Sequence, residues 1–372
     1  MKLLIITHVS HAYYNQEFWA YGPYVREINI WEKQVSKLAV IAPLKSNNPL
    51  PIDLPYHSTD IDFYSVPSFS LVGIGNKVKT IFAVPIIIWK MYFAMFRADH
   101  IHLRCPGNIG LLGCLLQLLF PFKHKTAKYA GNWDWNSKQP LSYRLQQRIL
   151  RNTFFTRNMQ VLVYGDWKET KNIKPFFTAS YSRNEINTTS PRELNRVKPI
   201  KLLFVGTLNE GKRPMISLET VKLLKERGHD CEINFFGDGP ELMKLKNFCE
   251  REFIRSSVYF HGNVNSEVVK LAYQDSQFLL FASQSEGWPK VVAESMFWGC
   301  LPITTAVSCV PEMVGNGLRG DLVEPNAEAI TSRIEYYLNN PKEYHKKCEE
   351  AMIWSRQFTL EKFEDEIKKL LV

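Results

Sequence analysis

A chain of 372 residues is longer than one hydrophobic core usually serves, so we expect two domains. With 45% hydrophobic and 22% charged residues, the composition is globular and excludes the disordered and fibrous classes. The net charge of +9 comes from residues 1–190, where 22 Lys and Arg face 11 Asp and Glu, whereas the remainder carries 24 against 26. The N-terminal half is therefore expected to bind an anionic partner, either a membrane surface or a nucleic acid. A nucleic acid is the weaker candidate, because the sequence contains no motif that reads nucleic acid.

The seven cysteines are scattered and form no CxxC pair. This pattern predicts neither a disulfide framework nor a zinc site, and it indicates a reducing, cytoplasmic compartment. The apolar run 3–6 is too short for a signal peptide. The apolar windows 81–96 and 109–122 fall short of the ~20 residues that a bilayer span needs. We expect both to be buried helices, or the first to be a helix lying on a membrane surface.

Strands and helices alternate along the N-terminal half, which predicts a doubly wound domain with a parallel sheet. Strands are expected at 1–7, 35–43, 62–67, 100–103, 125–130, 161–164 and 178–182, and helices at 77–96, 109–120 and 144–157. The aromatic segment 13–24 is interpreted either as a helix packed by its rings or as a platform that faces a ligand. The polar stretch 182–199 has no hydrophobic periodicity and is the predicted linker.

The same alternation restarts at residue 200. Strands are expected at 200–205, 231–236, 258–260, 278–281, 301–304 and 321–323, and helices at 215–227, 241–250, 265–275, 290–299, 328–339 and 341–372. The fold class is therefore α/β, with two Rossmann-like doubly wound domains, 1–190 and 191–355, facing a central cleft. A last helix, 356–372, is expected to cross back to the first domain.

One stretch of the second half has the local pattern of an anion site. A buried strand, 278–281, is followed by a polar turn and by Pro289, which starts a helix. Free backbone N–H groups and the helix dipole at such a junction attract phosphate. Glu286 and Glu294 bracket the junction, and their carboxylates are suited to sugar hydroxyls. The pattern indicates a nucleotide site.

Other single motifs are ambiguous. Gly237-x-Gly239 matches only part of a dinucleotide fingerprint and on its own is typical of a tight turn between a strand and a helix. Lys212-Arg213 is either a phosphate clamp or a solvated loop tip. Asp60-x-Asp62 has the spacing of a metal-binding pair, but no further ligand supports it. Neither a GxxxxGK[ST] motif nor a GxSxG motif occurs in the sequence.

The order of these signals is more specific than any one of them. Lys212-Arg213, the GDGP turn at 237–240, EGWPKVVAE at 286–294 and Pro311-Glu312 with Gly315 all follow expected strands of the second domain. In this order the chain resembles glycosyltransferase family 4, whose EGFG…E…A..G.P(V/I) signature is close to EGWPKVVAESMFWGCLPIT here. The resemblance implies the GT-B fold and transfer of a sugar from a nucleotide donor with retention of configuration and without a metal or other cofactor.

The resemblance also implies roles by position. Lys212 and Arg213 would neutralise the diphosphate together with the helix start at Pro289 and Lys290, Glu286 would approach the donor sugar, and Glu294 would bind the ribose. Further donor-side positions are Gly206, Thr207, Gly237, Gly239, Gly262, Val264, Gly287 and Trp288. The plainer interpretation of Glu294 is a helix carboxylate that only balances Lys290 at i−4.

Two positions depart from the family pattern. Thr207 stands where the family usually has arginine, and Gly131-Asn132 stands where it often has a histidine. His102 and Arg104 are the candidate replacements for the histidine. Gly22, Asn132 and Asp134 are further candidates on the acceptor or catalytic side. Arg104 and Asp134 are alternatively a structural ion pair.

The resulting prediction is a hexosyltransferase that moves sugar from a nucleotide-diphosphate donor to a glycan or polyprenyl-linked acceptor in cell-surface polysaccharide biosynthesis. The basic N-terminal domain is expected to hold it peripherally at the cytoplasmic face of an anionic membrane. A nucleotide-sugar epimerase and a donor-binding subunit without transfer activity remain alternatives. Neither a nucleic acid nor a metal is expected as a partner.

Overall fold

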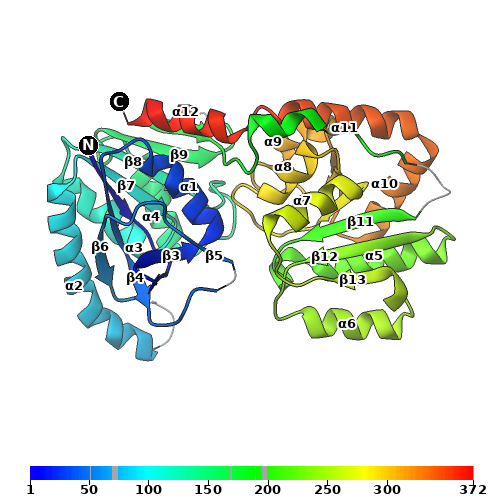
Figure 1. The fold of residues 1–372 in the computed structure, drawn as a ribbon, viewed down its shortest axis with the longest axis horizontal. Coiled ribbons are helices and arrows are strands. Elements are labelled where there is room, and N and C mark those ends of the chain that lie inside the picture. Colours follow the sequence, from blue (N-terminus) through cyan, green and yellow to red (C-terminus); the bar gives the residue numbers. More distant parts are fainter. Residues whose placement is uncertain (51, 69–73, 168–169, 189, 195–198, 372) are drawn as a thin grey trace. The chain divides into compact units, whose positions relative to one another are not determined.

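The computed structural model describes residues 1–50, 52–68, 74–167, 170–188, 190–194 and 199–371. The chain forms two compact units (Figure 1). Unit 1 comprises Met1–Phe177 and Phe363–Val372, and unit 2 comprises Thr178–Lys362. The boundaries therefore fall after residues 177 and 362, whereas the sequence pattern predicts them after residues 190 and 355. Among the described helices, none is both long and apolar enough to cross a bilayer.

Unit 1 is built on a mainly parallel sheet. Its strands are β1 (Lys2–Ile6), β4 (Lys37–Lys45), β6 (Ile61–Val66), β7 (His100–Cys105), β8 (His124–Tyr129), β9 (Met159–Tyr164) and β10 (Ile173–Phe176). The order is β10-β9-β8-β7-β1-β4, and β6 also pairs with β4. Leu3 to Ile6 of β1 are fully buried because helices cover both faces of the sheet at this central strand.

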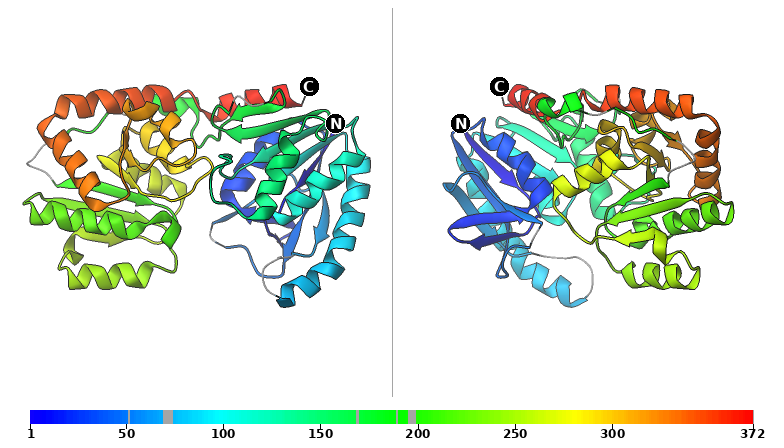
Figure 2. Two further views of the ribbon diagram at one scale, coloured as in Figure 1. Left: turned by 180° about the vertical axis from the view of Figure 1, so that it is seen from behind. Right: turned by 45° about the vertical axis from the view of Figure 1, so that its right-hand side comes forward.

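The helices of unit 1 divide between the two faces of this sheet (Figures 1 and 2). Three helices share one hydrophobic core with alternate residues of β1, β7, β8 and β9: α2 (Ile74–Arg97), α3 (Asn108–Leu116) and α4 (Leu141–Arg151). The opposite face packs against α1 (Gly22–Glu32), where Trp31 lies against His102, and against α12 (Leu360–Leu370), where Phe363 meets Phe176.

The aromatic segment near the N-terminus is a β-hairpin, so the expected helix over it is wrong. β2 (His11–Tyr14) pairs antiparallel with β3 (Glu17–Tyr21), and β5 (Asp53–Pro55) extends the pair. Asn15 and Gln16 form the two-residue turn with φ of 51° and 64°, as a hairpin turn with two positive φ values requires. Helix α1 begins only at Gly22.

The predicted strand at 178–182 is also absent, since the last strand of unit 1 is β10. The helix expected at 144–157 is displaced, because α4 already begins at Leu141 behind Pro140 and ends at Arg151. Pro140 is the N-cap with an extended ψ of 148°, and proline disfavours helical geometry in the residue before it, so the helix does not begin earlier.

Unit 2 contains a second, parallel sheet in the order β13-β12-β11-β14-β15-β16. Its strands are β11 (Ile200–Val205), β12 (Cys231–Phe236), β13 (Val258–Phe260), β14 (Phe278–Phe281), β15 (Leu301–Thr304) and β16 (Asp321–Leu322). The first five match the predicted bounds residue for residue. Buried, uninterrupted apolar strands of this kind are readable from sequence because both faces are covered.

Helices cover both faces of this sheet as well (Figures 1 and 2). One face packs against α5 (Pro214–Glu226), α6 (Leu242–Arg251), α10 (Ala327–Asn339) and α11 (Pro341–Ser355) through one hydrophobic core. The remaining helices are α7 (Ser266–Asp275), α8 (Lys290–Phe297) and the single turn α9 (Val310–Met313). The single helix expected over 341–372 is two helices, α11 and α12.

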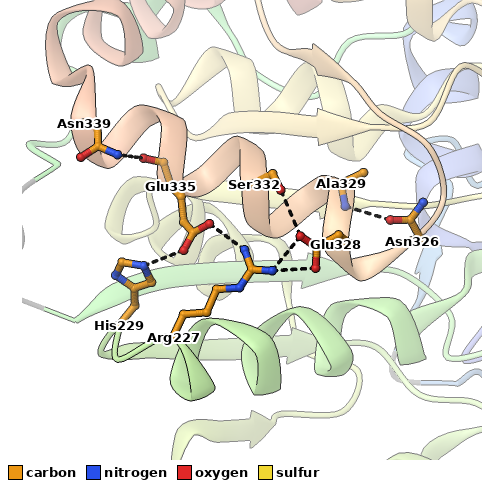
Figure 3. A network of polar contacts seen from close by, with 8 residues as sticks. All are labelled: Arg227, His229, Asn326, Glu328, Ala329, Ser332, Glu335 and Asn339. Carbon is orange, nitrogen blue, oxygen red and sulfur yellow. Dashed lines mark hydrogen bonds and ion pairs between the residues drawn. The ribbon is translucent and has the colours of Figure 1, made fainter.

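A polar network joins the end of α5 to α10 (Figure 3). Arg227 pairs with Glu328 and Glu335 at 2.7 Å each, and His229 contacts Glu335 at 3.0 Å. Asn326 caps α10 by accepting a hydrogen bond from the Ala329 N–H at 2.8 Å. The network is solvent-exposed and therefore orients α10 more than it stabilises the fold.

Candidate functional site

The carboxyl edge of the unit 2 sheet contains a topological switch point. From β11 the chain passes to β12 on one side, and β14 pairs with β11 on the other side. The loops that follow β11 and β14 therefore emerge side by side, which is where open parallel sheets bind ligands. The loop after β11 is residues 206–213 and the loop after β14 is residues 282–289.

These two loops are joined by backbone and side-chain contacts. The Gln284 N–H donates to the Gly211 carbonyl at 2.9 Å, and Lys212 Nζ forms an ion pair with Glu286. Ser283 Oγ also donates to Glu286, at 2.6 Å. The Lys212 and Glu286 side chains are 29% and 12% exposed, so the pair is partly screened from water but reachable. The residue predicted to neutralise the diphosphate and the residue predicted to approach the donor sugar thus lie in contact.

Arg213 has a conformation that the sequence pattern did not predict. Its φ of 51° lies in the left-handed region, and Pro214 follows as the first residue of α5. Proline disfavours the helical conformation in the preceding residue, which explains why Arg213 turns out of the helix. In the described part of the chain Arg213 makes no ion pair, so its guanidinium is available to an anion.

Glycines allow the neighbouring loops to approach one another closely. Gly206 donates its N–H to the Phe236 carbonyl at 2.9 Å, and Gly237 donates to Gly262 at 2.8 Å. Gly237 has φ of 134°, and a Cβ there would lie 2.0 Å from the Gly206 carbonyl oxygen. Gly239 is similarly crowded, because its Cβ would lie 2.4 Å from the Leu208 carbonyl oxygen.

We therefore expect Gly237→Ala to lower the thermal midpoint of unfolding by more than the matched control does. The matched control is Gly228→Ala, because Gly228 has φ of 81° but no atom lies within 4 Å of the point where its Cβ would stand. The control should cost about 1–2 kcal/mol for the left-handed backbone alone. Differential scanning fluorimetry of both variants measures the difference, and equal losses would contradict the steric argument.

The remaining positions predicted on the donor side follow strands of the unit 2 sheet. Thr207 and Val264 are exposed on the loops after β11 and β13. Gly287 accepts hydrogen bonds through its carbonyl from Ser308 Oγ and Cys309 Sγ, both at 3.2 Å. Trp288 packs against two aromatic rings of the α11 region, those of Trp354 and Phe358.

The start of α8 has no side-chain cap among the residues that the structure describes. Pro289 precedes the first helical residue, Lys290, and its side chain offers no acceptor to the first N–H groups of this helix. Uncapped N–H groups and the positive end of the helix dipole favour an anion at this position. The helix start that the sequence predicts after Pro289 is therefore present, and its binding of phosphate stays a prediction.

Glu294 lies in a different environment from Glu286. Its carboxylate accepts hydrogen bonds from Ser180 Oγ at 2.5 Å and from the Tyr273 hydroxyl at 3.1 Å. The predicted role of Glu294 as a carboxylate that only balances the charge of Lys290 does not account for these two hydrogen bonds. Nothing in the sequence pattern pointed to them, because Ser180 and Tyr273 are distant in the chain.

In unit 1 the structure argues against His102 as an acceptor-side residue. The His102 side chain is fully buried between the sheet and α1, where its Nδ1 lies 2.8 Å from Thr126 Oγ1. Burial, helped by the nearby Arg104 charge, holds the pKa of His102 well below its ordinary value. A neutral imidazole out of reach of solvent has a packing role.

Arg104 forms a structural ion pair, but not with the predicted partner. Arg104 pairs with Glu27 of α1, and Lys128 Nζ contacts the other oxygen of Glu27 at 2.9 Å. Asp134 instead closes a local turn by accepting from the Asn136 N–H at 2.9 Å. The predicted alternative of an Arg104–Asp134 pair is wrong.

Two further candidates have local structural roles. Asn132 accepts from the Asp134 N–H at 2.9 Å, which fixes the loop after β8. Gly22 donates its N–H to the Ile52 carbonyl at 3.0 Å, and a Cβ at Gly22 would lie 2.6 Å from that oxygen. Each contact gives its residue a structural role in the loop that holds it.

His8 is a site candidate that the sequence analysis did not select. It follows β1 at the carboxyl edge of the unit 1 sheet, and a Cβ at Gly107 would lie 2.6 Å from His8 Nδ1. Partial burial and the charge of Arg104 lower the pKa of His8. Its position directly after the first strand was the signal that could have found it.

The structure gives the Asp60-x-Asp62 pair cationic partners. Lys37 pairs with Asp60 and, at 3.4 Å, with Asp62, while Lys2 contacts Asp62 at 2.5 Å. Among the residues that the structure describes, no group of three His, Cys, Asp or Glu side chains is arranged to hold a metal.

Comparison with solved structures defines the fold class. The chain superimposes along its whole length on the Anabaena protein HepE in complex with UDP and glucose, with a TM-score of 0.70, 14% identity and 99% of that chain covered. The fold is therefore GT-B, with two Rossmann-like domains that each carry a parallel sheet.

Sequence comparison adds a family for one region. Residues 185–353 match the family model described as glycosyl transferases group 1. A protein of Haemophilus influenzae named an uncharacterized glycosyltransferase is 30% identical over 190 residues, which cover 50% of this chain and 53% of that one. The Escherichia coli protein WcaL, provisionally named a colanic acid biosynthesis glycosyltransferase, is 27% identical over 252 residues, 64% of this chain and 61% of its own. The matches thus span little more than half of these relatives.

Proposed function

We propose that this protein is a retaining glycosyltransferase that moves a hexose from a nucleoside-diphosphate donor to a glycan or polyprenyl-linked acceptor in cell-surface polysaccharide biosynthesis. The observation that carries the proposal is the Lys212–Glu286 pair at the switch point of unit 2. It lies within the region that matches the group 1 family model. The names of both relatives favour sugar transfer over epimerisation.

The donor diphosphate is proposed to bind between Lys212, Arg213 and the uncapped start of α8. Lys212 has three N–H donors, and the contact with Glu286 leaves others for phosphate oxygens. Negative charge develops on the leaving diphosphate when the sugar–phosphate bond breaks. Fixed cations and backbone N–H groups stabilise that charge without a metal ion, which is the largest catalytic contribution expected here.

Glu286 is proposed to approach the donor sugar and Glu294 the ribose. Ser283 and Lys212 hold the Glu286 carboxylate in place, which orients it before substrate binds. The Tyr273 hydroxyl supports Glu294 from the buried side, and the more exposed Ser180 contact is the one a ribose hydroxyl would join or replace.

A peripheral position at an anionic membrane is proposed on the surface of unit 1. The outer side of α2 exposes Trp89, Phe93 and Phe96 by 68%, 38% and 63%, while Ile87 and Met91 face the core. Residues 63–165 hold 13 Lys and Arg but only two acidic residues. Aromatic rings beside basic groups are suited to the interface of an anionic bilayer.

The donor assignment is tested by Glu294→Ala. Loss of a charged hydrogen-bond acceptor should weaken nucleoside-diphosphate binding about 10- to 100-fold, since such bonds contribute about 1.5–3 kcal/mol. Isothermal titration calorimetry against a panel of nucleoside diphosphates measures the dissociation constants. The control is Glu349→Ala, on the exposed side of α11. Unchanged affinity in Glu294→Ala would remove Glu294 from the donor site.

Transfer itself needs a separate assay, because binding alone fits a donor-binding subunit. We expect radiolabelled sugar to appear on a lipid-extractable or glycan acceptor only when acceptor is added. Release of free nucleotide and epimerised sugar without acceptor would instead identify an epimerase.

A further inference from the structure

A cavity of about 450 Å³ lies at the amino edge of the unit 1 sheet, opposite the edge that holds His8. The first residues of β7, β8 and β9 line it, together with the segment after α4 and Leu370 of α12. The lining residues are His100, His124, Lys125, Thr153, Thr156, Arg157, Asn158, Met159, Gln160, Lys171, Asn172 and Leu370. None of the proposed donor or acceptor residues belongs to it.

The lining is basic, and the described residues that form it include no carboxylate. Lys125, Arg157 and Lys171 carry positive charge, and His100 and His124 add two imidazoles. In the described part of the chain, Lys125, Arg157 and Lys171 make no ion pair with Asp or Glu. By contrast Lys128, three residues further along β8, is paired with Glu27.

Lys125 is the most informative of these groups. Its side chain is 2% exposed, and its Nζ donates to the Phe120 carbonyl at 2.6 Å. Burial lowers the pKa of Lys125 to about 8. A buried ammonium without a counter-charge is costly, and an anion bound in the cavity would supply that charge.

Exposed apolar side chains lie next to residues that line the cavity. Phe122 is 88% exposed, and Asn158, which lines the cavity, donates to the carbonyl of the adjacent Pro121 at 3.2 Å. Phe154 is 67% exposed and lies under the Arg157 guanidinium, 4.8 Å from its ring centre. A free phosphate ion would gain nothing from these rings, whereas a lipid would bury them.

We propose that this cavity binds the phosphate headgroup of an anionic phospholipid, with Phe122 and Phe154 entering the apolar layer. The proposal rests on the membrane part of the proposed function and not on sugar transfer. α2 lies beside the segment that leads into the cavity, because Lys123, the neighbour of the lining residue His124, donates through Nζ to the Phe96 carbonyl at 2.8 Å. Lipid phosphate therefore acts as the anchor beside an aromatic surface.

The test is co-sedimentation of the full chain with vesicles of phosphatidylglycerol and phosphatidylcholine or of phosphatidylcholine alone, at low and at physiological salt. The double variant Arg157→Glu with Lys171→Glu should reduce binding to the anionic vesicles at least tenfold. The control, Lys342→Glu with Lys346→Glu, makes the same charge change on exposed positions of α11 and should bind like the wild type. A second variant, Phe122→Ser with Phe154→Ser, should weaken vesicle binding without changing the charge.

A further arm titrates inorganic pyrophosphate into the protein without vesicles. Binding of pyrophosphate that is lost in Arg157→Glu/Lys171→Glu, with no binding to anionic vesicles, would overturn the lipid assignment in favour of a soluble anion. Equal vesicle binding by this variant and its control would overturn the site. Arg157 and Lys171 lie outside the donor site, so the Arg157→Glu/Lys171→Glu variant should transfer sugar to a soluble acceptor at the wild-type rate. Failure of the lipid-site proposal is therefore distinguishable from failure of the proposed function.

Discussion

Lys212→Met is expected to lower the rate of sugar transfer by about 100- to 1000-fold, which is the usual cost of removing one fixed group that stabilises a developing negative charge. The methionine keeps an unbranched side chain as far as the ε position but removes the charged ammonium group. Glu286 then loses its ion-pair partner, although Ser283 Oγ still holds one of its oxygens at 2.6 Å. We expect most of the loss in kcat, because the charge on the diphosphate is greatest in the transition state.

The control for this variant is Lys244→Met. The Lys244 side chain is 65% exposed on α6, and within the described residues its ion pair is with Glu241 at 3.3 Å. Lys244→Met therefore removes one positive charge from unit 2, as Lys212→Met does. Initial rates at saturating donor separate kcat from donor affinity. A rate in Lys212→Met within about tenfold of wild type, less than about 1.4 kcal/mol of barrier, would contradict the assignment of Lys212 to the leaving group.

Glu27→Ala should be the most destabilising of the substitutions considered, by about 3–5 kcal/mol, because it leaves two buried cations without their counter-charge. The Glu27 side chain is 6% exposed, and those of Arg104 and Lys128 are 11% and 1% exposed. The rings of Phe176 and Phe363 lie within 5.5 Å of Lys128 Nζ, so water has little room to replace the carboxylate.

The measurement is urea denaturation followed by circular dichroism, with Glu226→Ala as the exposed-carboxylate control. Glu27→Ala combined with Lys128→Met should recover part of the loss, because the second change removes one of the unpaired charges. A midpoint for Glu27→Ala close to that of the control would show that the cluster is solvated and contributes little.

The fold was predictable where both faces of a strand are buried. Apolar runs such as 200–205 and 278–281 identify buried strands from local sequence alone, and their predicted bounds agree with the structure. The hairpin at residues 11–21 was missed because its register depends on left-handed Asn15 and Gln16 and on cross-strand contacts such as Tyr13 with Phe18. Aromatic richness alone does not distinguish a hairpin from a helix.

The candidate site was predictable in part for a related reason. Lys212 and Glu286 follow strands that the sequence identifies, and the topology of a parallel sheet brings such loops together. The partners of Arg104 and Glu294 could not be predicted, since Glu27, Ser180 and Tyr273 reach them only through tertiary packing. His102 was predicted as a site residue because it lies in an expected strand close to the strand's carboxyl end. The sequence does not show whether its side chain is buried under a helix or lies at the open edge of the sheet.

The return of α12 to unit 1 has a consequence for the order of synthesis. Phe363, 1% exposed, packs against Phe176 and Phe177 and lies over Lys128, so unit 1 is complete only after α12 has been made. The ribosome must first synthesise the whole of unit 2, Thr178–Lys362, and this synthesis takes ~10–40 s at ordinary rates of translation. During that interval the nascent first domain has an uncovered apolar face, and chaperones have their longest access to it. An isolated first domain would have to be expressed with 363–372 fused behind residue 177.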